Sequence, residues 1–316
     1  MKNPTLYIGC DAHKSASVFC AIDEDGKTVW QGERPTTREG FESVKSRFGD
    51  YNAEIVLEAC SFIWKLVDML SQLGFQVFVC DPAKNPLVGK SRKKTDPEDA
   101  RKLAELLRAG YLSYVYIPTE EQRRLRAIGR ERHSLVRTRV RLLNQTHTSL
   151  YPHQVARRKR IIEAVSSEVE LLDDEVSRHA MSNEEIQLVM TTPGLGEYGA
   201  LLVIGEICTI RRFPRCAQYL AYCGLVPSVR QSGKSIRMGA TRRDSNSRLR
   251  WIYVQAAWSA ARWDPRLRAY FNRKAKEKGK KKAIVAVARK LASYNYWMLT
   301  KRVTYQELVS AVKVIG

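Results

Sequence analysis

One stretch of the sequence, KKTDPEDARKLAELL at residues 93–107, has the pattern of a helix start followed by an amphipathic helix. Asp96 stands where an N-cap is expected, Pro97 fits the first helical position, and Gly110 follows the predicted end. Asp96 and Asp99 are three residues apart, so their carboxylates can lie side by side. Helix capping and the helix dipole explain both acids equally well, so the stretch alone predicts a helix and leaves a functional site open.

Two further acids follow predicted strands upstream of this helix. Asp11 ends the apolar run at residues 6–10, and Glu58 ends the run at residues 55–57. The remaining predicted elements are strands at 17–22, 28–31 and 76–80 and short helices at 41–48 and 64–73. Three strands in a meander, followed by alternating helix and strand, predict an α/β domain with helices packed on a mixed sheet.

The placement of these acids predicts that Asp11, Glu58, Asp96 and Asp99 converge at one edge of the sheet. Their mutual repulsion would be unfavourable unless cations lay between them. Two Mg²⁺ ions, roughly 4 Å apart, would balance the charge and activate an in-line attack on a phosphate. A single acid at a strand end is more often a turn or cap residue, but the ordered set of four is a more specific pattern and predicts a metal site.

The composition favours a nucleic-acid partner. The chain has 316 residues, with 54 Lys and Arg against 33 Asp and Glu, a formal net charge of +21 and a sequence pI of about 9.8. Such a charge suits nucleic acid or an anionic membrane. No apolar run reaches the roughly 18 residues of a membrane span, and the N-terminus has no signal-peptide layout. The seven cysteines include no C-x-x-C pair, so we expect free thiols and a cytoplasmic location.

Residues 119–183 form a separate basic helical segment in the sequence pattern. A first long helix is crowded with arginines, at positions 123, 124, 126, 130, 132, 137, 139 and 141. A second, acidic helix carries Val165, Val169, Leu172 and Val176 at heptad spacing. The pattern predicts a helical hairpin or a dimerising coiled coil. The arginines either contact nucleic acid or pair with the acids of the second helix.

The remaining residues, 184–316, predict a mainly α-helical domain. Pro193-Gly194 and Gly196 indicate either a helix-hairpin-helix turn that approaches phosphate or an ordinary loop between helices. Residues 231–235, QSGKS, predict a small-residue loop, in which a serine is normally a turn residue. Residues 274–282 predict a basic loop in reach of phosphate, and a last core helix is expected from residue 284.

Several of these motifs together resemble a known family, the IS110-family transposases. YIGCDAHK at 7–14, Glu58-Ala59 and KTDPEDA at 94–100 are similar to its DEDD motifs. A second, ordered series of motifs resembles the C-terminal domain of the same family. It consists of Pro193-Gly194, Gly224-Leu225-Val226-Pro227, Ser232-Gly233, Asn246, Leu249-Arg250 and residues 281–291. The departures are Cys60-Ser61-Phe62 after the Glu-Ala pair and Ser245 before Asn246, where the family commonly has other residues.

The resemblance implies a RuvC-like, RNase H-type catalytic domain at 1–118, a coiled-coil segment at 119–183 and a transposase domain at 184–316. It implies Asp11, Glu58, Asp96 and Asp99 as the metal-binding tetrad, with Mg²⁺ as cofactor. Ser232 is the matching position of the nucleophile, and Ser235 is the fallback. Implied partners are donor and target DNA and a noncoding guide RNA, with a homo-oligomer, a dimer or a tetramer, as the assembly.

Because Ser232 has no neighbouring base, we expect a composite site in which the metal-binding domain meets the serine loop, in cis or from another subunit. Two alternatives stay open. A RuvC-type structure-specific nuclease would hydrolyse DNA with water and would not use Ser232. A nonenzymatic nucleic-acid-binding protein would tolerate alanine at Asp11 or Asp99.

Overall fold

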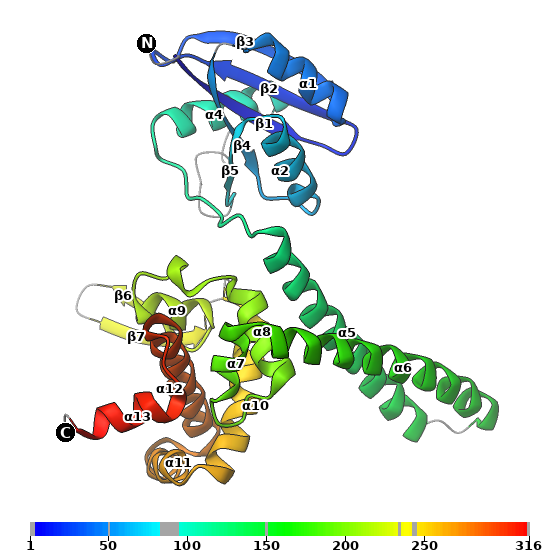
Figure 1. The fold of residues 1–316 in the computed structure, drawn as a ribbon, viewed down its shortest axis with the longest axis vertical. Helices are drawn as coiled ribbons and strands as arrows, with labels where there is room; N and C mark the ends of the chain where they lie inside the picture. Colours follow the sequence, from blue (N-terminus) through cyan, green and yellow to red (C-terminus); the bar gives the residue numbers. More distant parts are fainter. Residues whose placement is uncertain are drawn as a thin grey trace. The chain divides into compact units, whose positions relative to one another are not determined.

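The computed structural model describes residues 4–49, 51–82, 95–148, 151–232, 235–241 and 245–314, and no side chains for 228–244 or 312–314. The chain divides into two compact units, Met1–Ile117 and Pro118–Gly316 (Figure 1). None of the described helices is long and apolar enough to cross a membrane. All seven cysteines are free thiols, as expected.

The first unit is built on a five-stranded mixed sheet in the order β3-β2-β1-β4-β5. Its strands are β1 (Thr5–Ala12), β2 (Ala16–Ile22), β3 (Thr28–Pro35), β4 (Asn52–Glu58) and β5 (Gln76–Cys80). The first three pair antiparallel as a meander, and β4 lies parallel to both β1 and β5. The predicted α/β domain with a mixed sheet is confirmed.

Helices cover both faces of this sheet (Figure 1). On one face, α1 (Arg38–Arg47) and α2 (Ile63–Gln72) bury apolar side chains against Ile8 and Leu57. On the other, α4 (Asp96–Arg108) packs on β1, β2 and β4 through two smaller apolar clusters. The alternation of side chains along each strand supplies both faces.

Gly9 fixes how closely α4 approaches β1. A Cβ atom built on Gly9 would lie 1.9 Å from the carbonyl oxygen of Ala100 and 2.7 Å from the amide nitrogen of Ala104. Only a residue without a side chain permits this helix-to-strand distance. The glycine in the motif YIGCDAHK therefore lets α4 lie directly on β1 at Ala100, one turn after Asp96, and at Ala104.

The start of α4 corrects one prediction. Thr95, not Asp96, is the N-cap, so Asp96 is the first helical residue and Pro97 the second. The reason is the first helical hydrogen bond, in which the Asp99 N–H donates to the Thr95 carbonyl at 3.0 Å. The carboxylates of Asp96 and Asp99 are thus free of N-capping.

The second unit is helical apart from one hairpin. It begins with α5 (Glu120–His147) and α6 (Pro152–Ser182), which run antiparallel, as the ion pairs Arg124–Glu175 and Glu121–His179 show. It continues with α7 (Glu184–Met190), α8 (Glu197–Ile207), α9 (Cys216–Tyr222), β6 (Pro227–Ser232), β7 (Ser235–Thr241), α10 (Ser247–Trp263), α11 (Pro265–Lys278), α12 (Lys280–Lys301) and α13 (Tyr305–Val314). The central α8 is buried from Gly199 to Ile207 and contacts α5, α6, α7 and α10.

Three sequence predictions are wrong in this unit. The basic stretch at 274–282 is helical rather than a loop, because lysine is a good helix former and only Gly279, at φ +79°, separates α11 from α12. The helix from residue 284 is not the last, since α13 follows. Residues 231–235 mostly belong to the β6–β7 hairpin, with residues 233 and 234 outside the described part.

Candidate metal site and nucleic-acid interface

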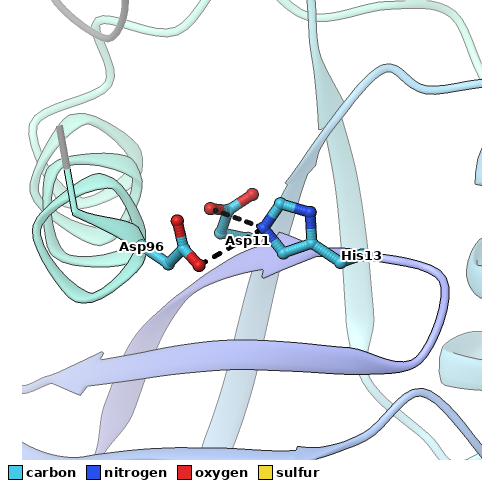
Figure 2. Close-up of side chains that lie close together, drawn as sticks. All are labelled: Asp11, His13 and Asp96. Atoms are coloured by element: carbon cyan, nitrogen blue, oxygen red, sulfur yellow. Dashed lines mark ion pairs between the residues drawn. The ribbon is translucent and has the colours of Figure 1, made fainter.

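The acidic end of the first unit brings together Asp11, His13 and Asp96, as Figure 2 shows. The His13 Nε2 atom lies 3.5 Å from Asp11 Oδ2 and 3.6 Å from Asp96 Oδ2. One donor atom from each of the three residues lies within 4.8 Å of the others. Asp11 and His13 come from the end of β1, and Asp96 opens α4, which Gly9 holds against that strand.

The electrostatics of this cluster favour a cation. Burial raises the pKa of Asp11 above its ordinary value, the negative charges of Asp96 and Asp99 raise it further, and His13 opposes them. An ionised carboxylate that shares its site with other acids is stabilised by a positive charge between them. Carboxylate oxygens suit Mg²⁺, and the imidazole nitrogen adds a donor more usual for transition metals. The donor set therefore fits a divalent cation.

The other two predicted metal ligands lie nearby but outside this cluster. Asp99 is 6% exposed and accepts from Lys102 Nζ at 3.2 Å, while its charge still raises the pKa of Asp11. Glu58 is the last residue of β4, and the register Cys10↔Leu57 places it beside Asp11 at the same end of two parallel strands. The structure thus joins Asp11 to Asp96 and places Asp99 and Glu58 next to them in the fold.

His13 is the member of the cluster that sequence reasoning missed. Its signal was its position two residues after Asp11 in YIGCDAHK, where the chain turns from β1 toward β2. Its side chain is 56% exposed, so solvent and a ligand can reach the imidazole.

Ser232 is the last residue of β6, and its Cα partner in the hairpin is Ser235. The backbone therefore places the two serines opposite one another across a tight hairpin end. The side chains of both serines, of Arg230 and of Arg237 lie outside the described part, as does Lys234 entirely. The role of Ser232 stays a prediction.

Two sets of arginines on α5 bear on the choice between charge pairing and nucleic-acid contact. Arg124 and Arg132 pair with Glu175 and Asp173 of α6, as the charge-pairing alternative predicted. In contrast, Arg137, Arg139 and Arg141 have no acidic partner among the residues that the structure describes. The second set is thus left without a compensating acid in the described chain, whereas the first set joins α5 to α6.

A buried carboxylate, Glu206 of α8, organises the region that follows the hairpin with Ser232. Glu206 is 0% exposed and accepts two hydrogen bonds from Arg130, at 2.7 and 2.8 Å, and one from Asn246 at 2.7 Å. Burial alone would raise its pKa, but these hydrogen bonds and charges hold it below the ordinary value. Asn246 in turn caps α10 by accepting from the N–H groups of Arg248 and Leu249. Sequence reasoning did not detect this network, because its members are far apart along the chain.

The glycine turn between α7 and α8 has a packing role. Gly194 has φ +84°, and a Cβ there would lie 2.3 Å from the carbonyl oxygen of Ala256 in α10. The turn thus lies against the backbone of α10, and this packing and the positive φ are sufficient to require glycine at position 194. Gly196, the N-cap residue of α8, has open space around it.

Comparison with known proteins agrees with these features. Residues 8–152 match the family model of the DEDD-type IS110 transposases, and residues 186–272 match the transposase IS116/IS110/IS902 family. The transposase for insertion sequence element IS1111A of Coxiella burnetii is 26% identical over 95% of this chain and 91% of its own. The transposase for IS1328 of Yersinia enterocolitica is 27% identical over 64% of this chain and 69% of its own. The region that matches the first family model contains Asp11, Glu58, Asp96 and Asp99. The region that matches the second contains Ser232. The chain belongs to the IS110 family of transposases.

Proposed function

We propose that this transposase cuts and rejoins DNA by a metal-dependent reaction at Asp11, Glu58, Asp96 and Asp99, with Ser232 as the nucleophile. The observation that carries the proposal is the convergence of Asp11, His13 and Asp96 at the carboxyl end of β1. A mixed sheet with helices on both faces and acids at strand ends is consistent with a RuvC-like, RNase H-like domain.

The carboxylates would hold the divalent cation. Asp11 and Asp96 offer oxygens at one point, and Asp99 and Glu58 flank them. When bound, Mg²⁺ would supply Lewis-acid stabilisation of the attacking and leaving oxygens of a phosphodiester. The chain's own task is to orient those carboxylates, which Gly9 and the first turn of α4 do.

The proposed nucleophilic step is a transesterification at phosphorus. A bond forms between the Ser232 oxygen and phosphorus, the bond from phosphorus to a deoxyribose oxygen breaks, and the leaving oxygen takes up the proton that the hydroxyl loses. The phosphodiester energy is kept in the protein–DNA link, so rejoining needs no external energy source. Support for Ser232 comes from its place in the family motif and at the end of β6.

Guidance by a noncoding RNA is the second part of the proposal. A net charge of +21 suits a polyanionic partner, and Arg137, Arg139 and Arg141 on α5 have no acidic partner in the described chain. Such a protein would bind RNA shape and DNA backbone, while base pairing with the RNA selects the sequence. A cytoplasmic location fits the free thiols.

The assembly is proposed to be a homo-oligomer, a dimer or tetramer, joined in part through the α5–α6 hairpin as a coiled coil. Apolar side chains remain exposed on this hairpin at Val140 (48%), Leu143 (39%) and Ile161 (45%). The heptad residues Val169 and Val176 are already buried within the unit, so they stabilise the hairpin itself.

Trapping the covalent link tests the proposal. In the presence of Mg²⁺ and DNA, wild-type protein should yield a DNA-linked peptide that contains Ser232. Ser232→Ala should lose the link while DNA binding persists, and Ser235→Ala serves as the matched control that keeps it. If Ser232→Ala still cuts and joins DNA at the normal rate, a water-using RuvC-type nuclease is the correct description.

A further inference from the structure

The helices α5, α8 and α10 lie together in the second unit (Figure 1). A cavity of about 490 Å³ is lined by side chains of all three. This volume is in the range of about 300–1,000 Å³ that ligand sites occupy. It is lined by Arg132, His133 and Arg137 of α5, Tyr198 of α8, and Arg248 and Trp251 of α10. The lining thus joins guanidinium groups to aromatic rings.

The positive charge in this cavity is only partly used by the protein. Arg132 pairs with Asp173, and its guanidinium lies 4.0 Å from the centre of the Tyr198 ring. Arg137 has no acidic partner in the described chain, and the Arg248 Nε atom is buried with no hydrogen-bond acceptor among the described residues. Glu206, the buried acid nearby, is already bonded to Arg130 and Asn246. A buried donor without an acceptor is unfavourable, so the cavity fits an anionic ligand.

The aromatic side of the cavity is presented to solvent. Trp251 is 39% exposed, and the His133 ring meets it edge-to-face with centroids 4.6 Å apart. Burial and then the charges of Arg248 and Arg137 lower the pKa of His133, so the imidazole is neutral near pH 7. His133 therefore supports the tryptophan without adding charge, and the exposed indole offers a stacking surface.

Trp251 also lines a second cavity, of about 470 Å³, together with Arg250, Trp258 and Lys281. Trp258 follows Trp251 by seven residues on the same helix, so both rings lie on one face of α10. A free inorganic anion would need only the cations. A row of exposed indoles with cations on both sides is the arrangement that single-stranded nucleic acid uses, with bases on the rings and phosphates on the charges.

We propose that the cavities on either side of Trp251 bind unpaired nucleotides of one nucleic-acid strand, with a base stacked on Trp251 and a phosphate at Arg137 and Arg248. A base inside a duplex is already stacked on its neighbours and cannot contact the indole in this way. The inference rests on the nucleic-acid partner of the proposed function, but it requires neither the metal site nor Ser232. DNA and RNA strands share the required chemistry.

Fluorescence anisotropy with the full chain in EDTA tests this proposal, because no cleavage can then occur by the metal-dependent route. The probes are labelled oligothymidylate, oligouridylate and a blunt DNA duplex. Trp251→Ala should weaken binding of at least one single strand by about fivefold or more and leave the duplex unchanged. Trp251→Phe should keep most of the affinity, and Trp263→Ala, on the same helix but away from both cavities, should behave as wild type.

The arginine contribution is tested with Arg137→Gln, which should weaken the same single strand and lower its salt slope by about one. Arg139→Gln, on the same helix but outside the cavity, should leave the preference for single strand over duplex unchanged. The stronger effect on oligothymidylate or on oligouridylate identifies a DNA or an RNA strand as the natural occupant.

Equal losses for single strand and duplex would overturn the proposal, since they would indicate a general basic surface. Unchanged binding in both Trp251→Ala and Arg137→Gln would also overturn it. Binding in EDTA requires neither the metal nor Ser232, so it is measured separately from the covalent-link assay. The nucleotide site and the proposed chemistry can therefore fail independently.

Discussion

Asp11 of the first unit and Glu206 of the second are both carboxylates that are at least partly buried. They differ in the charge of their neighbours, and their pKa values shift in opposite directions. Glu206 is fully buried and compensated by Arg130 and Asn246, which hold its pKa below the ordinary value. Asp11 is partly buried among other acids, His13 is its ion-pair partner among the residues that the structure describes, and its pKa is raised. A buried acid with a complete set of partners is structural. A buried acid whose neighbours are also acids lacks a positive charge, which a bound cation can supply.

The largest expected effect is on DNA strand exchange. Asp11→Asn and Asp96→Asn should each reduce it roughly a thousandfold, because several kcal/mol of transition-state stabilisation would be lost with the cation. Strand exchange is measured on donor and target DNA with the matching guide RNA. Asp25→Asn, an exposed acid in the β2–β3 turn, is the control. Near-normal exchange by the double variant Asp11→Asn/Asp96→Asn would return these acids to a structural role.

A stability measurement tests the other half of the comparison. Arg130→Ala should lower the free energy of unfolding of the second unit by about 3 kcal/mol, because it leaves Glu206 buried without its cation. Removing one partner of a buried ion pair typically costs about 3–5 kcal/mol. We expect the lower value because the Arg130 side chain is 43% exposed. Arg124→Ala breaks a more exposed pair with Glu175 and should change stability by less than about 1 kcal/mol. Equal effects of the two variants in urea unfolding would show that burial does not distinguish them.

The two acids should also give opposite pH dependences in EDTA. The folded pKa of Asp11 is above its ordinary value of 3.8, so between these two pKa values the folded state binds more protons than the unfolded state. The free energy of unfolding therefore falls as pH rises from 3.8 through the folded pKa. The folded pKa of Glu206 is below its ordinary 4.5, so its contribution is complete above 4.5 and is lost as pH falls through the folded value. Urea unfolding is measured across acidic pH for wild type, Asp11→Asn and Glu206→Gln. The difference in free energy of unfolding between wild type and each variant gives the pH dependence due to that acid. Slopes of the same sign would contradict the comparison.

The smallest expected effect concerns the salt dependence of nucleic-acid binding. Replacing Arg137 and Arg139 with Gln should lower the slope of log affinity against log salt by about two, one for each lost phosphate contact. Arg132→Gln should leave the slope nearly unchanged, because Asp173 already neutralises that guanidinium. A slope that falls as much for Arg132→Gln would mean that the ion pair with α6 opens on binding.

The sequence placed Asp11 at a strand end and Asp96 at a helix start because both are local patterns. Asp11 closes an apolar strand, Asp96 opens a helix with Pro97, and Gly9 allows the two to meet. The N-cap was misplaced by one residue, since capping preference does not show which carbonyl accepts the first helical hydrogen bond. His13 was missed because one histidine after a strand has no spacing that predicts a ligand.

The second unit was harder to predict because its important contacts are long-range. Arg130, Glu206 and Asn246 are separated by at least forty residues and meet only through the packing of α5, α8 and α10. The cavity beside Trp251 likewise joins three helices, so no local pattern marks it. The basic stretch near Gly279 was misread as a loop because charge density says little about backbone conformation.

Titration of Mn²⁺ into the metal-free protein, followed by calorimetry, tests most directly whether the acid without a compensating partner is a cation site. Wild type and Asp25→Asn should bind Mn²⁺ alike, and Mg²⁺ should compete for the same site. Asp11→Asn and Asp96→Asn should each lose this binding while keeping the fold, as judged by circular dichroism. Undiminished binding of Mn²⁺ by both variants would show that the Asp11–Asp96 cluster does not hold the metal and would contradict the assignment.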